Sequence, residues 1–208
     1  MRITMVTILW AAAVALAPAC KSNERAPASS ATAAPSPSKP APRAAPEPGA
    51  ATATLSDARI AAIVVAANQV DVDAGKLAVG KTSNAEVKKF AEQMVTDHSA
   101  VNQAAVELVT KLQVTPEESD ASRGLVSSGA ENRAKLTPLE GEAFDRAYVD
   151  NEVAYHQAVI GVLDGQLIPS ATNEELKQML VGVRPALVAH LQHAQHLQTS
   201  LAGDASGK

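Results

Sequence analysis

The most regular hydrophobic pattern in the chain lies between Ser83 and Leu112. Its positions follow one another at alternating steps of four and three residues, the spacing of a helix that packs one face into a bundle. The positions are Val87, Ala91, Met94, His98, Val101, Ala105, Leu108 and Leu112. Seven of these eight are apolar and His98 is not. The pattern therefore predicts a long amphipathic helix that carries one imidazole on its packed face.

The same spacing recurs in three other stretches. One runs from Ile60 to Leu77, a second from Val149 to Leu167 and a third from Leu176 to Leu201. Gly165 is expected to stop or distort the second of these helices. Pro185 lies inside the third, where its missing N–H should bend the helix. The chain thus contains four long predicted helices.

Four predicted helix starts carry a Ser or Thr followed three residues later by Glu, which is a capping box. The pairs are Ser83/Glu86, Thr115/Glu118, Thr137/Glu140 and Thr172/Glu175. The second pair adds a short helix over residues 116–133, between the second and third long helices. The predicted fold is all-α: an antiparallel four-helix bundle over residues 55–202, with this extra helix and a disordered tail at 203–208.

The N-terminal segment predicts that the protein is exported from the cytoplasm. Met1 and Arg2 precede an apolar run, residues 3–17, that is shorter than the roughly 20 residues of a membrane span and has the proportions of a signal peptide. The predicted signal peptide covers residues 1–19. Small residues precede Cys20, as in a bacterial lipoprotein whose cysteine is lipidated. Ordinary cleavage at the same bond, leaving a free thiol, is the alternative. The lipoprotein is favoured because Cys20 is the only cysteine.

Residues 21–54 are rich in Ala, Pro and Ser, so they predict a disordered tether behind the lipid anchor at Cys20. We expect the anchored protein in the cell envelope, in the outer membrane facing the periplasm, or otherwise free in the periplasm. The net charge of −4 and the absence of a Lys/Arg cluster argue against nucleic acid as a partner. A single cysteine excludes an internal disulfide and any multi-cysteine metal site.

Three histidines fall on the packed faces of three different helices: His98, His156 and His190. A buried imidazole without a partner costs on the order of 1–3 kcal/mol, so three of them need an explanation. Two explanations are possible. In the first, each imidazole is hydrogen-bonded to a carboxylate, a tyrosine or a carbonyl. In the second explanation, inward-facing histidines and carboxylates hold a divalent metal ion, as in the metal sites of helical bundles. The candidate ligands are Asp71, His98, Glu152, His156 and His190, and Asp97 and Tyr148 are assigned to a buried polar network.

Spacing favours the hydrogen-bonded alternative. The Glu-x-x-His pairs of di-iron bundles are missing before all three histidines. Counted from a turn near Ile168, His156 and His190 differ by about 13 Å along the helix axis, which is too far for one ion. His190 is instead expected level with Tyr148 and Glu152. The sequence also shows no Ser-His-Asp order and no activated cysteine, so a hydrolase is not expected.

The segments that carry this pattern resemble the family called domain of unknown function 4142. They are Lys76 to Ala78, Val87 to Phe90, Met94 to His98, Phe144 to Tyr148, Tyr155-His156 and Pro185 to Leu191. The resemblance spans residues 60–201. It implies an exported bacterial protein, often labelled an outer membrane protein, with a ferritin-like helical bundle. His98, Tyr148, His156 and His190 match recurrent polar positions of the family, whereas Asp71 stands where a glutamate is common.

Two functions are compatible with these features. The first is a non-enzymatic envelope lipoprotein whose bundle serves as an interaction or stress-related module. The second is a ferritin-like protein that binds a metal or acts as an oxidoreductase through its inward histidines and carboxylates. The first is favoured because the Glu-x-x-His pairs are missing.

Overall fold

Helices make up all the regular secondary structure of the computed structural model, which describes residues 55–206. Their bounds are α1 Asp57–Lys81, α2 Ala85–Lys111, α3 Asp120–Leu136, α4 Gly141–Val162, α5 Ile168–Ser170 and α6 Glu174–Ser206, with a π-helical turn η1, Leu163–Leu167, between α4 and α5. The predicted all-α class is confirmed. The predictions for the signal peptide, Cys20 and the tether concern residues outside this range.

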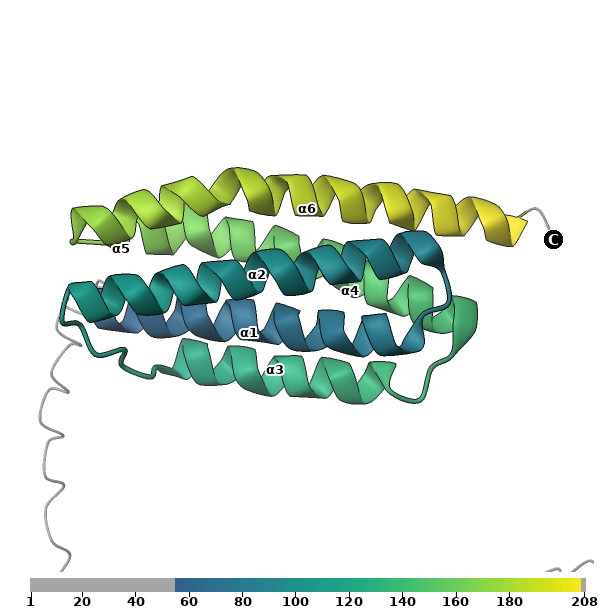
Figure 1. The fold of residues 1–208 in the computed structure, drawn as a ribbon, viewed down its shortest axis with the longest axis horizontal. Coiled ribbons are helices and arrows are strands. Elements are labelled where there is room, and N and C mark those ends of the chain that lie inside the picture. The colour runs from purple at the N-terminus through teal and green to yellow at the C-terminus, as the bar shows by residue number, and fades with distance from the viewer. Residues whose placement is uncertain (1–54, 207–208) are drawn as a thin grey trace, which may run out of the picture. The chain divides into compact units, whose positions relative to one another are not determined.

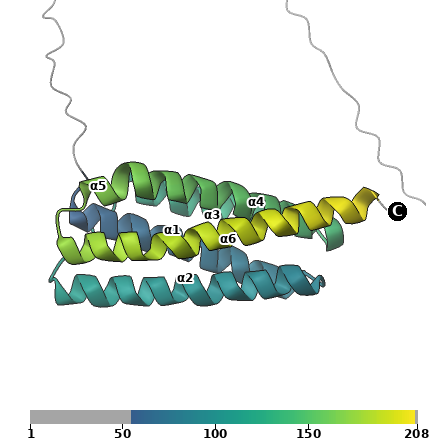
Figure 2. The same cartoon turned by 90° about the horizontal axis from the view of Figure 1, so that it is seen from above.

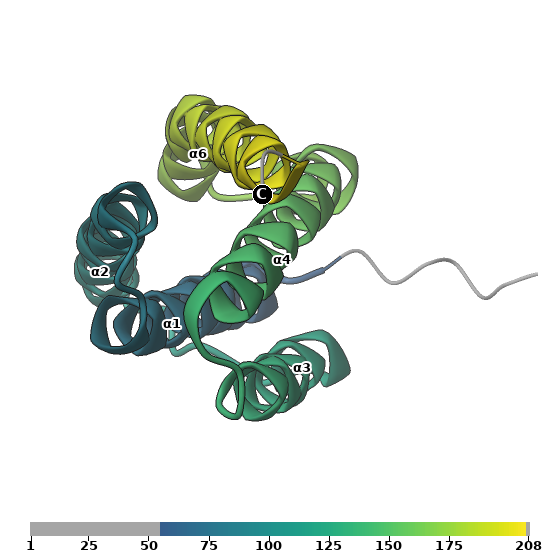
Figure 3. The ribbon, with the colours of Figure 1, turned by 90° about the vertical axis from the view of Figure 1, so that its right-hand side faces the viewer.

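The axes of the long helices are roughly aligned with one another (Figures 1 and 2). Helix α1 packs against α2 and against α3, and α4 packs against α6. Viewed end-on, α1, α2, α6 and α4 surround a shared interior, and α3 lies on the outer side of α1 (Figure 3). Helix α3 has 17 residues and corresponds to the extra helix predicted over residues 116–133, moved a few residues toward the C-terminus.

The helices begin one to four residues later than the predicted capping boxes place them. Asn84, rather than Ser83, caps α2, because its side-chain oxygen accepts hydrogen bonds from the backbone N–H groups of Glu86 and Val87. Asparagine is as good an N-cap as serine, so a choice between neighbours cannot be made from the pattern alone. Helix α3 starts with a capping box at Ser119 and Ser122. The last helix extends to Ser206, beyond the tail predicted from residue 203.

Two apolar clusters fill the interior. One contains Phe90, Phe144 and Tyr148, near the turn from α1 to α2. The other contains Ile60 and Leu180 and lies toward the start of α1 and of α6. In each of α1, α2, α4 and α6, the segment between these clusters carries polar residues that are buried. A polar layer therefore crosses the interior at mid-length.

Glycines allow two close helix contacts. A Cβ on Gly75 in α1 would lie 2.9 Å from Cγ2 of Val95 in α2. A Cβ on Gly129 in α3 would lie 2.7 Å from a methyl carbon of Val70 in α1. These contacts hold α1 tightly between α2 and α3. Within the part of the chain that the structure describes, no helix is both long and apolar enough to span a membrane.

Candidate metal centre

The polar layer brings together all five predicted ligands. Helix α1 contributes Asp71, α2 contributes His98, α4 contributes Glu152 and His156, and α6 contributes His190. Each is at most 4% exposed. Each belongs to the inward face of an amphipathic helix, so the packing that buries the apolar neighbours also buries these polar groups.

The three imidazoles form a mutually contacting triangle. Their ring centroids are 5.6 Å apart for His98 and His156, 5.3 Å for His98 and His190, and 5.5 Å for His156 and His190. One ring nitrogen from each lies within 4.8 Å of the other two. The three rings are therefore close enough for one nitrogen of each to approach a single ion.

The expected axial separation of His156 and His190 is wrong. The helical path does not end near Gly165, because the π-helical turn and α5 continue it to Ser170. His156 lies 14 residues before Ser170, and His190 lies 16 residues after Glu174, where α6 begins. At about 1.5 Å per residue these positions differ in level by only about 3 Å.

Asn68 orients the ring of His98. The Asn68 amide nitrogen donates to the carbonyl of Val64 at 2.8 Å, which leaves the amide oxygen as an acceptor. That oxygen lies 2.7 Å from Nδ1 of His98. Nδ1 of His98 therefore carries the hydrogen, and Nε2 has a free lone pair. Sequence reasoning missed Asn68, although it precedes Asp71 by one helical turn on the same face.

The other two imidazoles are held in the same way. Nδ1 of His156 lies 3.0 Å from the backbone carbonyl oxygen of Glu152. Nε2 of His190 lies 2.9 Å from the carboxylate of Asp97, whose side chain is 43% exposed. Each ring thus donates one N–H to an oxygen. The remaining nitrogens, Nε2 of His98, Nε2 of His156 and Nδ1 of His190, are buried and accept no hydrogen bond from any described residue.

Asp71 faces two of these free nitrogens. Its Oδ2 lies 3.0 Å from Nε2 of His98 and 3.5 Å from Nε2 of His156. Neither contact has the angles of a hydrogen bond. The Asp71 carboxyl lies beside that of Glu152, and the two share a hydrogen bond when one of them is protonated. The Asp71 carboxylate and two ring nitrogens with lone pairs therefore lie within one small volume, where a proton or a metal ion between them reduces their mutual repulsion.

Burial keeps His98 and His156 neutral. It lowers the pKa of His98 to about 3, with further lowering by His156 and His190. It also lowers the pKa of His156 to about 4, which the hydrogen bond to the Glu152 carbonyl partly offsets. At neutral pH these two rings have unprotonated nitrogens, the form that binds metals.

The pKa values of the two buried carboxyl groups, Asp71 and Glu152, are shifted upward. Burial raises the pKa of Asp71 to about 7. It raises the pKa of Glu152 well above its ordinary value, and the charge of Asp71 raises it further. An oxygen of Asp71, an oxygen of Glu152 and a nitrogen of His156 lie within 4.8 Å of one another, so His156 is shared by two groups of possible ligands.

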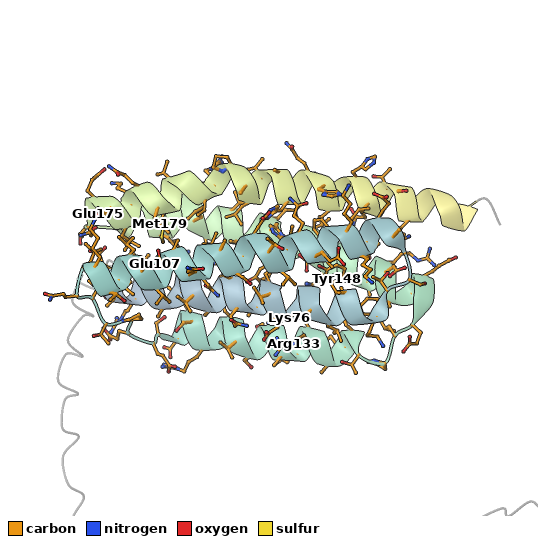
Figure 4. All side chains as sticks on the ribbon, in the orientation of Figure 1. Lys76, Glu107, Arg133, Tyr148, Glu175 and Met179 are labelled. Atoms are coloured by element: carbon orange, nitrogen blue, oxygen red, sulfur yellow. The ribbon has the colours of Figure 1, made fainter. Side chains whose placement is uncertain are left out.

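Tyr148 lies on α4 one helical turn before Glu152 and is fully buried in the interior between the helices (Figure 4). Its hydroxyl is buried with no hydrogen-bond partner in the described part of the chain. Burial raises the pKa of Tyr148 well above 10, and the charges of Glu152 and Asp71 add to the rise. Of the two residues assigned to a polar network, Asp97 therefore has a direct partner in His190. The Tyr148 hydroxyl has no hydrogen bond to any described residue.

An apolar cavity of about 630 Å³ adjoins the histidines. Four of the five candidate ligands line one part of it: Asp71, His98, His156 and His190. Most other lining side chains are aliphatic and come from α1, α3, α4, η1 and α6. The candidate centre is thus accessible from a largely apolar space.

Comparison with known proteins identifies the family and the fold. No curated protein matches the chain. The fold is similar to the crystal structure of a protein described as a secreted DUF305 protein from Streptomyces coelicolor, with a TM-score of 0.61 and 15% sequence identity. The match covers 70% of this chain and 93% of that one. Residues 41–197 match the family described as Domain of unknown function (DUF4142), and the chain belongs to that family.

Proposed function

We propose that the protein binds a divalent transition-metal ion through His98, His156 and His190, with Asp71 as a carboxylate ligand. The observation that carries this proposal is the set of three buried imidazoles, each with one nitrogen bonded to an oxygen and the other unpartnered among the described residues. Histidines that bind metals characteristically donate their second N–H to a carboxylate or a carbonyl, which fixes the ring.

A purely structural role explains the centre less well. The hydrogen-bonded alternative accounts for one nitrogen of each ring, as expected from the sequence. It leaves three buried ring nitrogens without a partner among the described residues, and each unsatisfied polar group costs about 1–3 kcal/mol. A cation at the point they face would satisfy all of them at once.

The ligand types favour zinc, copper, iron or nickel, because imidazole nitrogens suit these ions. Nitrogens that share a zinc ion lie at most about 4 Å apart, since each bond is about 2.0–2.1 Å long. One nitrogen of each ring lies within 4.8 Å of one nitrogen of the other two, so a small inward movement of the rings would bring the three to one ion. Three histidines leave the fourth position of a zinc ion to Asp71, to water or to a further ligand.

Zinc titration by calorimetry, using protein purified without a histidine tag, tests the proposal. We expect one zinc ion per chain, with binding lost in His98→Ala and in His156→Ala. His196→Ala is the matched control, because His196 is exposed on α6 outside the cluster. Circular dichroism verifies that each variant remains helical. Protein that takes up no zinc, copper, iron or nickel and shows no change in melting temperature with these ions would contradict the proposal and favour a non-enzymatic interaction module.

We also propose that α1, α2, α4 and α6 form a ferritin-like four-helix bundle, to which α3 is an addition. Support comes from their arrangement around one interior (Figure 3) and from the ligands that all four contribute to it. An experimental structure of the domain tests this arrangement. A different set of helices around the histidines would contradict it.

The proposed site of action is the cell envelope, with Cys20 as the lipid anchor. The apolar run before Cys20 and the likeness to a secreted DUF305 protein support export. Processing that is sensitive to globomycin, and palmitate incorporation that disappears in Cys20→Ser, are the expected results. Unchanged processing and labelling in Cys20→Ser would indicate an ordinary secreted protein.

A further inference from the structure

The cavity beside the proposed centre is larger than a metal site requires. Its volume of about 630 Å³ falls within the roughly 300–1,000 Å³ that is typical of small-molecule sites. Apart from the polar groups near the histidines, its wall is mainly aliphatic. The aliphatic side chains include Ile63, Val64, Val101, Leu125, Val159, Leu163, Leu180, Val183 and Leu187.

The cavity is long in the direction of the helices. Along α4 and η1 its lining residues run from Tyr155 to Leu167, twelve residues or about 18 Å. Along α6 they run from His190 back to Leu180, ten residues or about 15 Å. The histidines are at one end of this path and the aliphatic side chains of the second apolar cluster are at the other. Such a shape suits one extended chain with a polar head.

The cavity also reaches solvent. Several of its lining residues are exposed, among them Gly124 and Ser128 on α3, Ala158 and Val162 on α4, and Ala186 on α6. Most of these residues are small, so they leave an opening beside α4. A ligand can therefore enter without separation of the helices.

The charge at the polar end favours an anionic head. A divalent ion held by three neutral imidazoles and the carboxylate of Asp71 retains one net positive charge. Asp97, the other carboxylate in the lining, is partly exposed and already accepts the N–H of His190. A carboxylate can neutralise the remaining charge and act as a ligand of the ion.

We propose that this cavity binds a single-chain fatty acid, with its carboxylate on the metal ion and its alkyl chain along α4 and α6. The position of the head group rests on the proposed metal site, and the position of the chain rests on the shape and lining of the cavity. The metal centre would then be a receptor for a lipid acid.

Fluorescence titration with a dansyl-labelled undecanoate, displaced by laurate, tests this proposal on the zinc-loaded protein. We expect saturable binding of one probe per chain, and affinity roughly tenfold or more weaker when zinc is removed. Val159→Phe fills part of the cavity and should weaken binding by roughly tenfold or more without changing zinc affinity. Ala158→Phe, at an exposed lining position, is a second variant that disturbs the core less.

Val181→Phe is the matched control, since Val181 is 51% exposed on α6 and does not line the cavity. It should bind the probe as the unaltered protein does. Zinc binding without probe binding would overturn the fatty-acid site and leave the metal site intact. Equal affinity with and without zinc, or displacement by dodecylamine as strong as by laurate, would overturn the carboxylate–metal contact. Failure of zinc itself to bind would contradict the proposed function.

Discussion

Asn68 decides which nitrogen of His98 is available, although it is not itself a candidate ligand. Its amide nitrogen is used by the Val64 carbonyl, so its oxygen can only accept the Nδ1 hydrogen of His98. The Asp97 carboxylate and the Glu152 carbonyl do the same for His190 and His156. At the scale of single residues, the centre therefore depends on a second set of groups that position the ligands.

Removing the Asn68 amide should weaken metal binding without removing a ligand. For Asn68→Ala we expect zinc affinity to fall by roughly 10- to 100-fold, because His98 loses the acceptor that orients its ring. Competition with a chelating dye measures the change. Gln69→Ala is the control, since Gln69 is exposed on the adjacent position of α1 and its side-chain amide donates to Asp73. Equal affinity in Asn68→Ala and Gln69→Ala would exclude a positioning role for Asn68.

Asp71 should make zinc binding depend on pH. Burial raises its pKa to about 7, so below that pH the group holds a proton that the metal must displace. His98 and His156, with pKa values of about 3 and 4, hold no competing proton in this range. Affinity should therefore rise with pH by up to about tenfold per unit until about pH 7, and then level off.

Calorimetry in buffers of different protonation enthalpy measures the proton released. In Asp71→Asn that release and the associated rise in affinity should disappear. A pH dependence that Asp71→Asn leaves unchanged would show that the competing proton is held elsewhere.

At the scale of helices, the connection between α4 and α6 determines whether the ligands align. The π-helical turn at Leu163–Leu167 carries the chain past Gly165 in helical form. His156 and His190 consequently reach the same level from opposite sides of the turn at residues 171–173. The placement of α3 depends on a different feature, the close contact between Gly129 and Val70.

A methyl group at Gly129 should disrupt the contact between α1 and α3. Gly129→Ala places a Cβ 2.7 Å from Val70, and such overpacking typically costs about 1–3 kcal/mol of unfolding free energy. Gly161→Ala is the control, because its added Cβ meets no atom of the described structure within 4 Å. It should stabilise α4 by about 0.5–1 kcal/mol. Urea unfolding measures both, and a Gly129→Ala protein as stable as Gly161→Ala would contradict the observed contact.

At the scale of the whole molecule, the centre connects the four helices that supply its ligands. Metal binding to the folded state alone should therefore stabilise the complete domain rather than one helix. Free zinc at 100 times its dissociation constant should add about 2.7 kcal/mol to the free energy of unfolding. A single thermal transition that shifts upward with zinc is expected by calorimetry. The His98→Ala protein should show no shift, and a zinc-induced shift of the same size in that variant would place the ion elsewhere.

The sequence by itself determined the helices and their inward faces. The three–four spacing predicted all four long helices, and it placed Asp71, His98, Glu152, His156 and His190 on or beside the packed faces. This succeeded because hydrophobic periodicity is a local property that burial must respect. The extra helix between the second and third long ones was also foreseen, with its start four residues too early, because several capping residues compete within one turn.

Only the tertiary structure decided which of these residues meet. Counting from a turn near Ile168 separates His190 from His156, whereas the helical path continues through Gly165 as a π-helical turn and ends at Ser170. An error of a few residues in the position of a turn moves every later residue along the helix axis by about 1.5 Å per residue. Such a shift is enough to bring the ligands of a metal centre together or to separate them. The roles of Asn68 and of the apolar cavity likewise depend on contacts between helices that are distant in sequence. Local pattern thus defines the faces, and the connections between helices define the site.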